Sequence, residues 1–588
     1  MSVIPSPSSR CARVWACIQR TPWQLAVVVS LSYLLLAAMW LSPLLGSMTQ
    51  KIATHRGSFD WTDDLFLLEY MARGITHGHL SFDTRLLGAP SGVNLSWTAL
   101  NYFWLALFFP ITIWFGVIAA YNSIVLVSLA TNGMAMYWSS RRWMRRRTSA
   151  FLAGVLFMFS PYVMAHTLID HLDLISVWTV PVFFALLYDA MTERRYSLRK
   201  SGLIIGLILS IQAFTSEEVL ALMIVGGAIA VCFWLVANHL DRAMLKSLLR
   251  LALWAAPLGM VGVLLVTIAQ FAGGHVIHGA LVNSTPFSAN ALDFILPGRW
   301  VIATLPYING IMARINYDPH ESAAVYIGVP VLIVMYAQFK RRHRSDRYLV
   351  GAIVVICIFM LGYQLAIGSH VFNISIMPMK LIAVIPMLRN LLPVRIGLLA
   401  DVAVVILLCR YVDSLRWRRS DGKRWVLVAI VMLSWLPLLP SGVAPVVPPY
   451  FTHYASPRHG GRPIMLVVPF AQTGPTSVSE YWQARAHDRF AMPEGYYVSR
   501  PSRGMVLGLG PVPTKFTVDL FMMTLYGRFP YPYRSVTGVR QYLRSRDVSA
   551  VVLGPTAHQV GLLKALTYWL SQKPVRDQGV WIWRPKGF

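Results

Sequence analysis

Long apolar segments separated by short basic clusters are the feature that most limits the folds open to this chain. Residues 25–46 are apolar over a length that crosses a bilayer, and similar segments recur through the first 442 residues. Of the 588 residues, 56% are hydrophobic and only 13% are charged, and the mean hydropathy is +0.54. A soluble protein of this length carries far more charge. We therefore predict a polytopic α-helical membrane protein.

The basic residues indicate how these segments are oriented. Arg10, Arg13 and Arg20 precede the first segment, and five further clusters separate later ones: 141–147, 194–200, 242–250, 340–347 and 410–424. Together they hold half of the 52 Lys and Arg residues that give the chain its formal net charge of +27. Cytoplasmic loops are enriched in Lys and Arg, so the N-terminus is predicted to be cytoplasmic. Because the charge is a topology signal, nucleic acid is excluded as a partner.

Placing these clusters inside predicts about eleven spans, near 25–46, 120–140, 149–165, 172–191, 202–216, 218–237, 251–272, 323–339, 348–367, 394–412 and 425–442. The apolar run 98–118 would put every later cluster outside if it crossed the membrane. We therefore predict a juxtamembrane or re-entrant helix there. The first span lacks the short core and cleavage site of a signal peptide and is expected to remain as an anchor.

This topology leaves three long outer segments: 47–119, 273–322 and the residues after 443. The last of them begins with a Pro-rich linker and is less apolar than the rest. Apolar runs favour strands at 463–470, 549–555 and 579–585, and helical periodicity favours helices at 517–529, 537–547 and 558–572. We expect a transmembrane domain over 1–442 and a small extracytoplasmic α/β domain over 443–588.

Acidic residues gather where the chain emerges on the outer side. They form three groups, which are Asp60, Asp63 and Asp64; Asp170 and Asp173 with His171; and Glu217 with Glu218. Ionisable groups at membrane depth are costly and usually mark function. Each group alone has a simpler explanation, because loop acids can be solvated and an acid at a helix start can be a cap. Three groups on one face nevertheless favour a single site.

Some basic residues in the outer loops are not needed for topology, among them Arg314 and the four candidates for donor binding, Arg299, Lys380, Arg389 and Arg395. A guanidinium can hold two phosphate oxygens through its planar fork, so these residues are candidates for binding an anionic donor. Contact with lipid headgroups, or snorkelling to the interface, is the alternative for any one of them.

Several of these segments resemble the GT-C superfamily of polytopic glycosyltransferases, and within it a large bacterial set. The resemblance rests on WTDDLFLLEYMARGI and APSGVNLSW in the first outer loop, SPYVMAHTLIDHLDL, SIQAFTSEEVLAL, and EGYYVSRPS near the C-terminus. It implies a transferase in the bacterial inner membrane with a periplasmic C-terminal domain. Such an enzyme moves a sugar from a polyprenyl-phosphate donor to a hydroxyl of a glycolipid, polysaccharide or protein.

The resemblance also implies roles for the acids. The family's first-loop acid maps onto Asp63, which would act as general base, with Asp60 or Asp64 orienting the acceptor. Asp170 and Asp173 are candidates for the second acid, although the resemblance implies an asparagine in related proteins at the position of Asp173. Arg389 and Arg395 could stabilise the leaving phosphate. Mg²⁺ or Mn²⁺ held by acids such as Asp63 and Asp173 could do the same.

Two other classes of function are compatible with the sequence. A transporter or a flippase for lipid-linked glycans would carry charges along a pathway through its spans. Here the spans are nearly free of charge apart from Asp401, and the acids lie at one face, which favours an enzyme. A non-catalytic scaffold for envelope assembly is the third possibility.

Overall fold

The computed structural model describes residues 22–55, 60–98, 101–192, 196–238, 242–341, 343–385, 388–416, 421–455, 462–472, 476–500, 506, 508–527 and 536–584. The arginines of the N-terminal tail lie outside these ranges. Eight helical segments in the described part are long and apolar enough to cross a membrane: Trp23–Trp40, Val117–Ser140, Arg147–Leu168, Leu172–Met191, Leu198–Thr215, Glu217–Ala237, Ala243–Phe271 and Pro319–Lys340. The predicted polytopic α-helical class is therefore confirmed.

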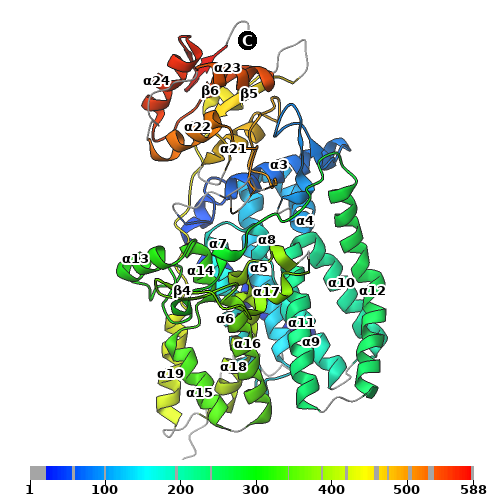
Figure 1. Ribbon diagram of the computed structural model, residues 1–588. Helices are drawn as coiled ribbons and strands as arrows, with labels where there is room; N and C mark the ends of the chain where they lie inside the picture. Colours follow the sequence, from blue (N-terminus) through cyan, green and yellow to red (C-terminus); the bar gives the residue numbers. More distant parts are fainter. Residues whose placement is uncertain are drawn as a thin grey trace, which may run out of the picture.

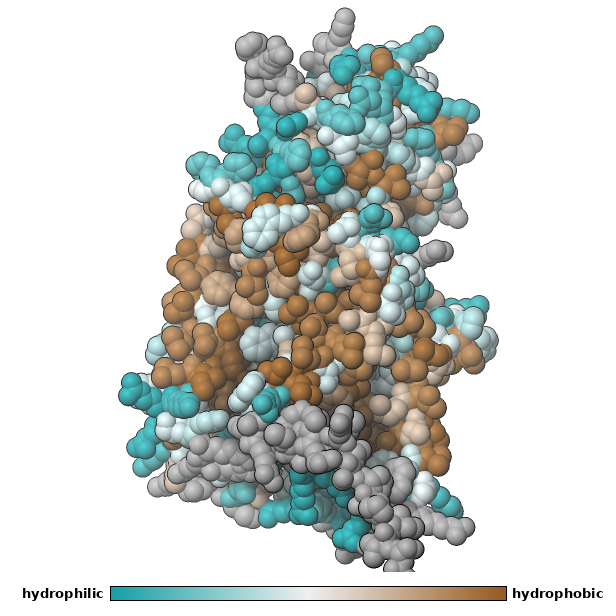
Figure 2. Space-filling view, turned by 180° about the vertical axis from the view of Figure 1, so that it is seen from behind, coloured by the Kyte–Doolittle hydropathy of each residue, from teal (hydrophilic) through white to brown (hydrophobic). Residues whose placement is uncertain are grey.

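The helices form an elongated bundle (Figure 1). It contains α2 (Pro22–Trp40), α5 (Val117–Ser140), α6 (Arg147–Met158), α9 (Thr179–Met191), α10 (Leu198–Thr215), α11 (Glu217–Ala237), α12 (Arg242–Phe271), α15 (Val329–Lys340), α16 (Arg344–Met360), α18 (Gly397–Ser414) and α19 (Gly422–Ser434). On the face drawn in Figure 2, a broad hydrophobic band crosses the bundle, with hydrophilic surface above it and hydrophilic residues at its lower edge. This is the surface expected of a protein surrounded by lipid.

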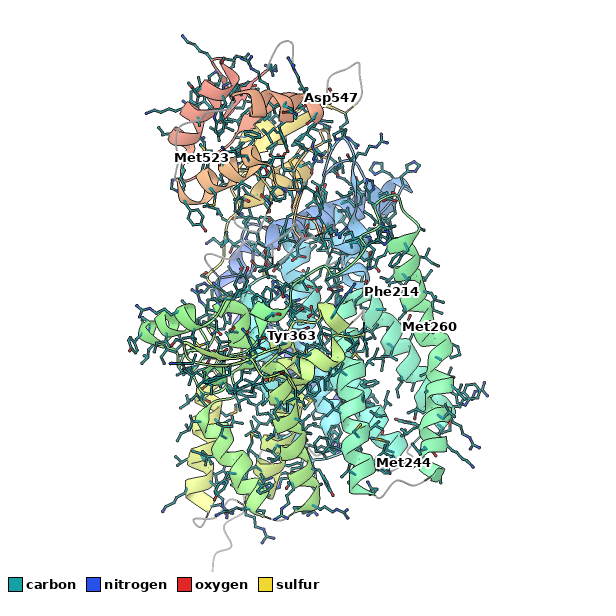
Figure 3. All side chains as sticks on the ribbon, viewed as in Figure 1. Phe214, Met244, Met260, Tyr363, Met523 and Asp547 are labelled. Carbon is teal, nitrogen blue, oxygen red and sulfur yellow. The ribbon has the colours of Figure 1, made fainter. Side chains whose placement is uncertain are left out.

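The two ends of the bundle differ in charge. In Figure 3, Met244 near the start of α12 marks the lower end and Phe214 near the end of α10 lies toward the upper end. Because successive helices alternate in direction, the described parts of all five basic clusters lie at the lower end. The acidic groups lie at the upper end, where the outer loops gather.

Some predicted spans differ from the observed helices. The span predicted at 149–165 is interrupted at Phe159 and Ser160, because α6 ends at Met158 and α7 (Pro161–Leu168) begins with a proline. The span predicted at 348–367 ends at Met360, because residues 365–367 form a strand. The helices α16, α18 and α19 pack beside α15 but are shorter or more charged than the eight segments above.

The apolar run predicted as a juxtamembrane or re-entrant helix forms α4 (Tyr102–Phe115), which contains Pro110. Its 14 residues are too few to cross a bilayer. It packs on α3 (Trp61–His77) and on α5, and Gly116 separates it from α5. With φ of 89° and ψ of 164°, Gly116 adopts a backbone conformation that suits glycine and allows a sharp turn there.

The outer loops build a layer of short elements above the bundle. It includes the hairpin of β1 (Asp83–Thr84) with β2 (Val93–Asn94), the hairpin of β3 (Leu365–Ile367) with β4 (His370–Phe372), and the helices α8 (Leu172–Ile175), α13 (Pro306–Ile315), α14 (Pro319–Ser322), α17 (Pro378–Ile382) and α20 (Pro449–Thr452). Seven short 3₁₀ turns join them: η1 (Ser42–Ser47), η2 (Leu95–Trp97), η3 (Thr285–Phe287), η4 (Ala291–Phe294), η5 (Ala323–Val325), η6 (Leu388–Asn390) and η7 (Pro393–Ile396). The outer loop predicted between the spans 348–367 and 394–412 is thus longer than expected and extends over 361–396.

The C-terminal part is an α/β domain at the top of the molecule (Figure 1). Its sheet has the order β5 (Ile464–Val468), β6 (Val548–Leu553), β8 (Val580–Trp583) and β7 (Val575–Asp577), and β5 and β6 are parallel. The helices are α21 (Val478–Arg485), α22 (Lys515–Tyr526), α23 (Val536–Ser545) and α24 (Gln559–Leu570). All three predicted strands and all three predicted helices are present, whereas β7 was not predicted.

Candidate functional site

The first acidic group lies at the start of α3. Asp60 occupies the position before the helix, but its side chain makes no capping hydrogen bond. Its carboxylate instead accepts a hydrogen bond from His171, with 3.2 Å between Oδ2 and Nε2. The simple explanation that Asp60 serves as a helix cap is therefore wrong.

The second group lies on the turn between α7 and α8. The chain reaches this turn through α7, which follows the interruption after α6. Asp170 has a φ of 70° and is buried, and the Tyr121 hydroxyl donates to it at 3.5 Å. Asp173 lies in the first turn of α8, and the Ser216 hydroxyl donates to its Oδ2 at 3.4 Å. His171 therefore faces Asp60, while Asp173 faces the start of α11.

The third group joins the cluster through Arg395. This guanidinium donates to Glu321 at 2.5 and 3.3 Å, and it also donates to Glu218. Glu218 accepts a further hydrogen bond from the Leu392 amide at 3.1 Å. Glu217 instead accepts from Gln270 at 2.7 Å and ties α11 to α12. The alternative that Glu217 and Glu218 serve only as caps of α11 is wrong, because Ser216 is the cap.

The three predicted groups thus lie together, with Glu321 as a member that the sequence did not reveal. We call Asp60, Asp63, Asp64, Asp170, Asp173, Glu218 and Glu321 the acid cluster. Glu321 follows Pro319 in a short outer helix, and no pattern in its surroundings distinguished it from a cap.

Burial and nearby negative charges determine the direction in which the pKa values of Asp63 and Asp64 shift. Burial raises the pKa of Asp63 well above its usual range, and the nearby charges of Glu480, Asp60 and Asp173 raise it further. Burial, with the charges of Asp63 and Asp173, has the same effect on the pKa of Asp64. One oxygen of each carboxyl has no hydrogen-bond partner among the described residues. Both groups therefore keep their protons to a higher pH than an exposed aspartate does.

For the pKa of His171, the neighbouring acids together have a larger effect than burial. Burial lowers its pKa, but the hydrogen bond with Asp60 and the charge of Glu321 outweigh burial and raise the pKa to about 9. Nδ1 of this ring lies 3.4 Å from Glu321 and 3.0 Å from Nδ1 of His166. An imidazolium here would neutralise part of the acid cluster.

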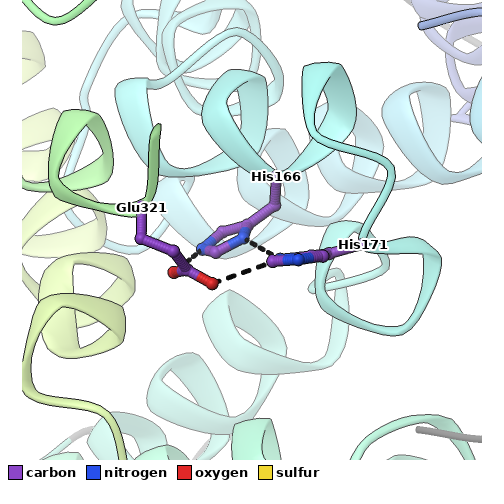
Figure 4. A group of neighbouring side chains, drawn as sticks. All are labelled: His166, His171 and Glu321. Carbon is purple, nitrogen blue, oxygen red and sulfur yellow. Dashed lines mark hydrogen bonds and ion pairs between the residues drawn. The ribbon is translucent and has the colours of Figure 1, made fainter. Parts of the chain in front are cut away.

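His166, His171 and Glu321 also form a group that could hold a metal ion (Figure 4). Two ring nitrogens and a carboxylate oxygen are a donor set that suits Zn²⁺ or Mn²⁺ better than Mg²⁺. His171 also contacts a carboxylate through its other nitrogen, as metal-binding histidines commonly do. This set differs from the pair predicted from the sequence, Asp63 and Asp173.

The four predicted cations have different surroundings. Arg395 is committed to Glu218 and Glu321, and Arg299 contacts His320 at 2.7 Å. Lys380 donates to Asn373 and to the Ile374 carbonyl, both at 2.8 Å. Arg389 instead lines a hollow of about 470 Å³ together with Arg500, which the sequence did not indicate. Ser284, Thr285 and Tyr363 also line this hollow, which we call the cationic hollow.

The C-terminal domain reaches the acid cluster through α21 and the segment 494–497. Glu480 is fully buried, and its carboxylate accepts a hydrogen bond from the Tyr496 amide. The side chain of Tyr496 is hydrogen-bonded to Asp60. Neither residue was predicted as part of the site, although EGYYVSRPS was noted for its resemblance.

Comparison with known proteins agrees with this architecture. No protein-family model matches the sequence, and no curated protein matches it either. The structure of the arabinofuranosyltransferase AftD from Mycobacteria is similar, with a TM-score of 0.56 and 16% sequence identity over 96% of this chain. The alignment covers 40% of AftD, so the chain spans about two fifths of the length of that protein.

Two further structures are more distant. The archaeal oligosaccharyltransferase AglB from Archaeoglobus fulgidus has a TM-score of 0.46 at 10% identity, covering 89% of this chain and 69% of AglB. ArnT from Cupriavidus metallidurans, solved with undecaprenyl phosphate, has a TM-score of 0.39 at 11% identity, covering 95% and 97% of the two chains.

Proposed function

We propose that this chain, which has the fold of the GT-C membrane glycosyltransferases, transfers a sugar from a polyprenyl-phosphate donor to a hydroxyl acceptor. The observation that carries the proposal is the acid cluster, in which carboxyls from four separate segments meet at the end of the bundle opposite the basic loops. Carboxyls gathered in this way can take up a proton and hold a sugar.

Asp63 is our candidate for the general base. An acceptor hydroxyl becomes a nucleophile when a carboxylate removes its proton during attack on the anomeric carbon. The raised pKa of Asp63 makes its ionised form a stronger base than an exposed aspartate. Asp60, which is held by His171, would orient the acceptor.

The leaving phosphate needs positive charge as the bond to the sugar breaks. We assign this role to Arg389 and Arg500 in the cationic hollow, because Arg395 is already paired with two carboxylates. A divalent ion at His166, His171 and Glu321 would supply additional charge to the same end of the site. Glycan, lipid and protein acceptors are all compatible with this chemistry.

The location follows the same reasoning. With the basic loops in the cytoplasm, the acid cluster and the C-terminal domain would lie on the periplasmic side of a bacterial inner membrane. Transport is less well supported, because Asp401 lies within the bundle but accepts a hydrogen bond from the Tyr162 amide at 2.9 Å and thus has a structural use.

The test is a transfer assay with purified protein, a panel of labelled polyprenyl-phosphate sugars and a membrane extract as acceptor. We expect label to move with the parent protein, and Asp63→Asn to lower the rate by at least about 100-fold, the lower range for loss of a general base. Asp83→Asn is a matched control, since Asp83 is an exposed outer-loop acid. Full activity of Asp63→Asn would refute its role. A parent that consumes no donor would refute the transferase, and lipid flux in proteoliposomes would then be measured.

A further inference from the structure

The docking of the C-terminal domain is specific. The Met492 amide donates to the Leu86 carbonyl at 2.8 Å, and the Ala89 amide donates to the Met492 carbonyl at 2.9 Å. The Gln483 side chain donates to the Leu86 carbonyl as well, at 2.9 Å, although it is fully buried. The domain is therefore held on the first outer loop by main-chain hydrogen bonds that fix its register.

This docking brings α21 against α3. The rings of Tyr481 and Trp61 meet edge to face, with 6.3 Å between their centroids. On the same helix, the buried carboxyl of Glu480 lies close enough to Asp63, the proposed base, for its charge to raise the pKa of Asp63. Asp60, which would orient the acceptor, is hydrogen-bonded to the side chain of Tyr496. Two residues of the C-terminal domain thus lie beside the two functional acids of the first loop.

We propose that Glu480 and Tyr496 are positioning residues of the active site, so that the C-terminal domain completes the site rather than only covering it. Tyr496 links the two contacts, because its amide donates to Glu480 and its side chain bonds Asp60. Glu480 places a second carboxyl beside the base and so sets the pH at which the base ionises. This inference rests on the proposed function, because a positioning role presupposes a reaction. The interaction between the two carboxyls can nevertheless be tested without enzymatic activity.

The charged groups around Asp63 fix the direction of the effect. Glu480 faces it from α21, Asp60 and Asp64 lie on or next to its own helix, and Asp173 faces it from α8. All four are acids, so removing the charge of Glu480 makes ionisation of Asp63 easier.

The first experiment is the pH profile of kcat/KM for sugar transfer. We expect Glu480→Gln to move the acid limb to lower pH by about one unit, the usual effect of one nearby charge. Tyr496→Phe is expected to lower kcat/KM by about tenfold, as loss of one hydrogen bond to an ionised group does. Glu494→Gln is the matched control, because Glu494 is an equally buried carboxyl of the same domain that accepts from the Val467 amide. An unchanged profile in Glu480→Gln would overturn the inference.

A second experiment needs no enzymatic activity. The melting temperatures of the parent, Asp63→Asn, Glu480→Gln and the double variant form a double-mutant cycle at pH 8. We expect the two changes not to add, because the charge of Glu480 affects the ionisation of Asp63 in the parent and this coupling is lost once either carboxyl is replaced. Additive changes would overturn the inference even if the parent transfers sugar. Non-additive changes in a parent without transfer would support the carboxyl pair and refute only the proposed function.

Discussion

At the scale of single residues, Arg395 is the charge on which the acid cluster depends. It is the partner of both Glu218 and Glu321, and the exposed fraction of its side chain is only 17%. Without it, two carboxylates would face each other with little solvent.

We predict that Arg395→Met lowers the free energy of unfolding by about 3–5 kcal/mol, the usual effect of removing one partner of a buried ion pair. The measurement is thermal or denaturant unfolding in detergent. Arg424→Met serves as control, since Arg424 pairs with Asp421 at 3.0 Å but the exposed fraction of its side chain is 51%. The control should change stability by about 1 kcal/mol or less. Equal effects of the two substitutions would contradict the prediction.

The acids also show what could be predicted at this scale. That Asp60, Asp63, Asp64, Asp170 and Asp173 meet could be anticipated, because topology places all of them on one face. Glu321 and Glu480 could not, since each lies on a short helix far along the chain and contacts the others only through tertiary packing. The ion pairs of Arg395 with Glu218 and Glu321 could not be predicted either, because the three residues are far apart in the sequence.

At the scale of elements, close packing of α10 on α12 depends on small residues. A Cβ added at Gly206 would lie 2.3 Å from the Ala255 carbonyl oxygen, and one at Gly262 would lie 2.5 Å from the Ser210 carbonyl oxygen. Helices in membranes commonly approach each other through such residues, because lipid gives them no hydrophobic drive to associate.

We predict that Gly206→Ala lowers stability by about 1–3 kcal/mol, as overpacking a tight contact does. Gly259→Ala is the matched control on the same helix pair, where the added Cβ would lie at an ordinary contact distance of 3.6 Å. Because alanine favours the helix over glycine, the control is expected to leave stability unchanged or raise it. Indistinguishable melting temperatures for the two variants would contradict the prediction that close packing of α10 on α12 requires glycine at position 206.

Element boundaries were predictable where the hydrophobic pattern was long and uniform, as in α5 and α11. The pattern failed at the outer ends of the spans. The break at Ser160 and the strand at 365–367 keep the same apolar composition as the helices beside them, so hydropathy alone could not mark them.

At the scale of the whole molecule, buried carboxyls make the docked state sensitive to pH. Burial raises the pKa of Asp63, Asp64, Glu480 and Glu494. These groups hold protons in the folded protein that they release on unfolding at higher pH. The folded state binds more protons than the unfolded state, so stability contributed by these groups is present at low pH and is lost as the pH rises above about 4.5.

We therefore predict that the melting temperature of the parent falls between pH 5 and pH 8, and that Glu480→Gln with Glu494→Gln makes this fall shallower. Thermal unfolding across this range in one detergent checks the prediction. Parallel curves for parent and double variant would show that these two carboxyls do not carry the effect.

The docking of the last domain on the first loop has a consequence for biosynthesis. Leu86 and Gln483 are 397 positions apart, so the first loop emerges long before its partner exists. At roughly 5–20 residues per second, the ribosome takes on the order of 20 to 80 s to make the intervening chain. During that interval the face of α3 that packs against α21 has no partner from the C-terminal domain. A chain released early carries the aspartates of α3 without α21 and Tyr496 beside them, so translation has to reach the C-terminal domain before the proposed site is complete.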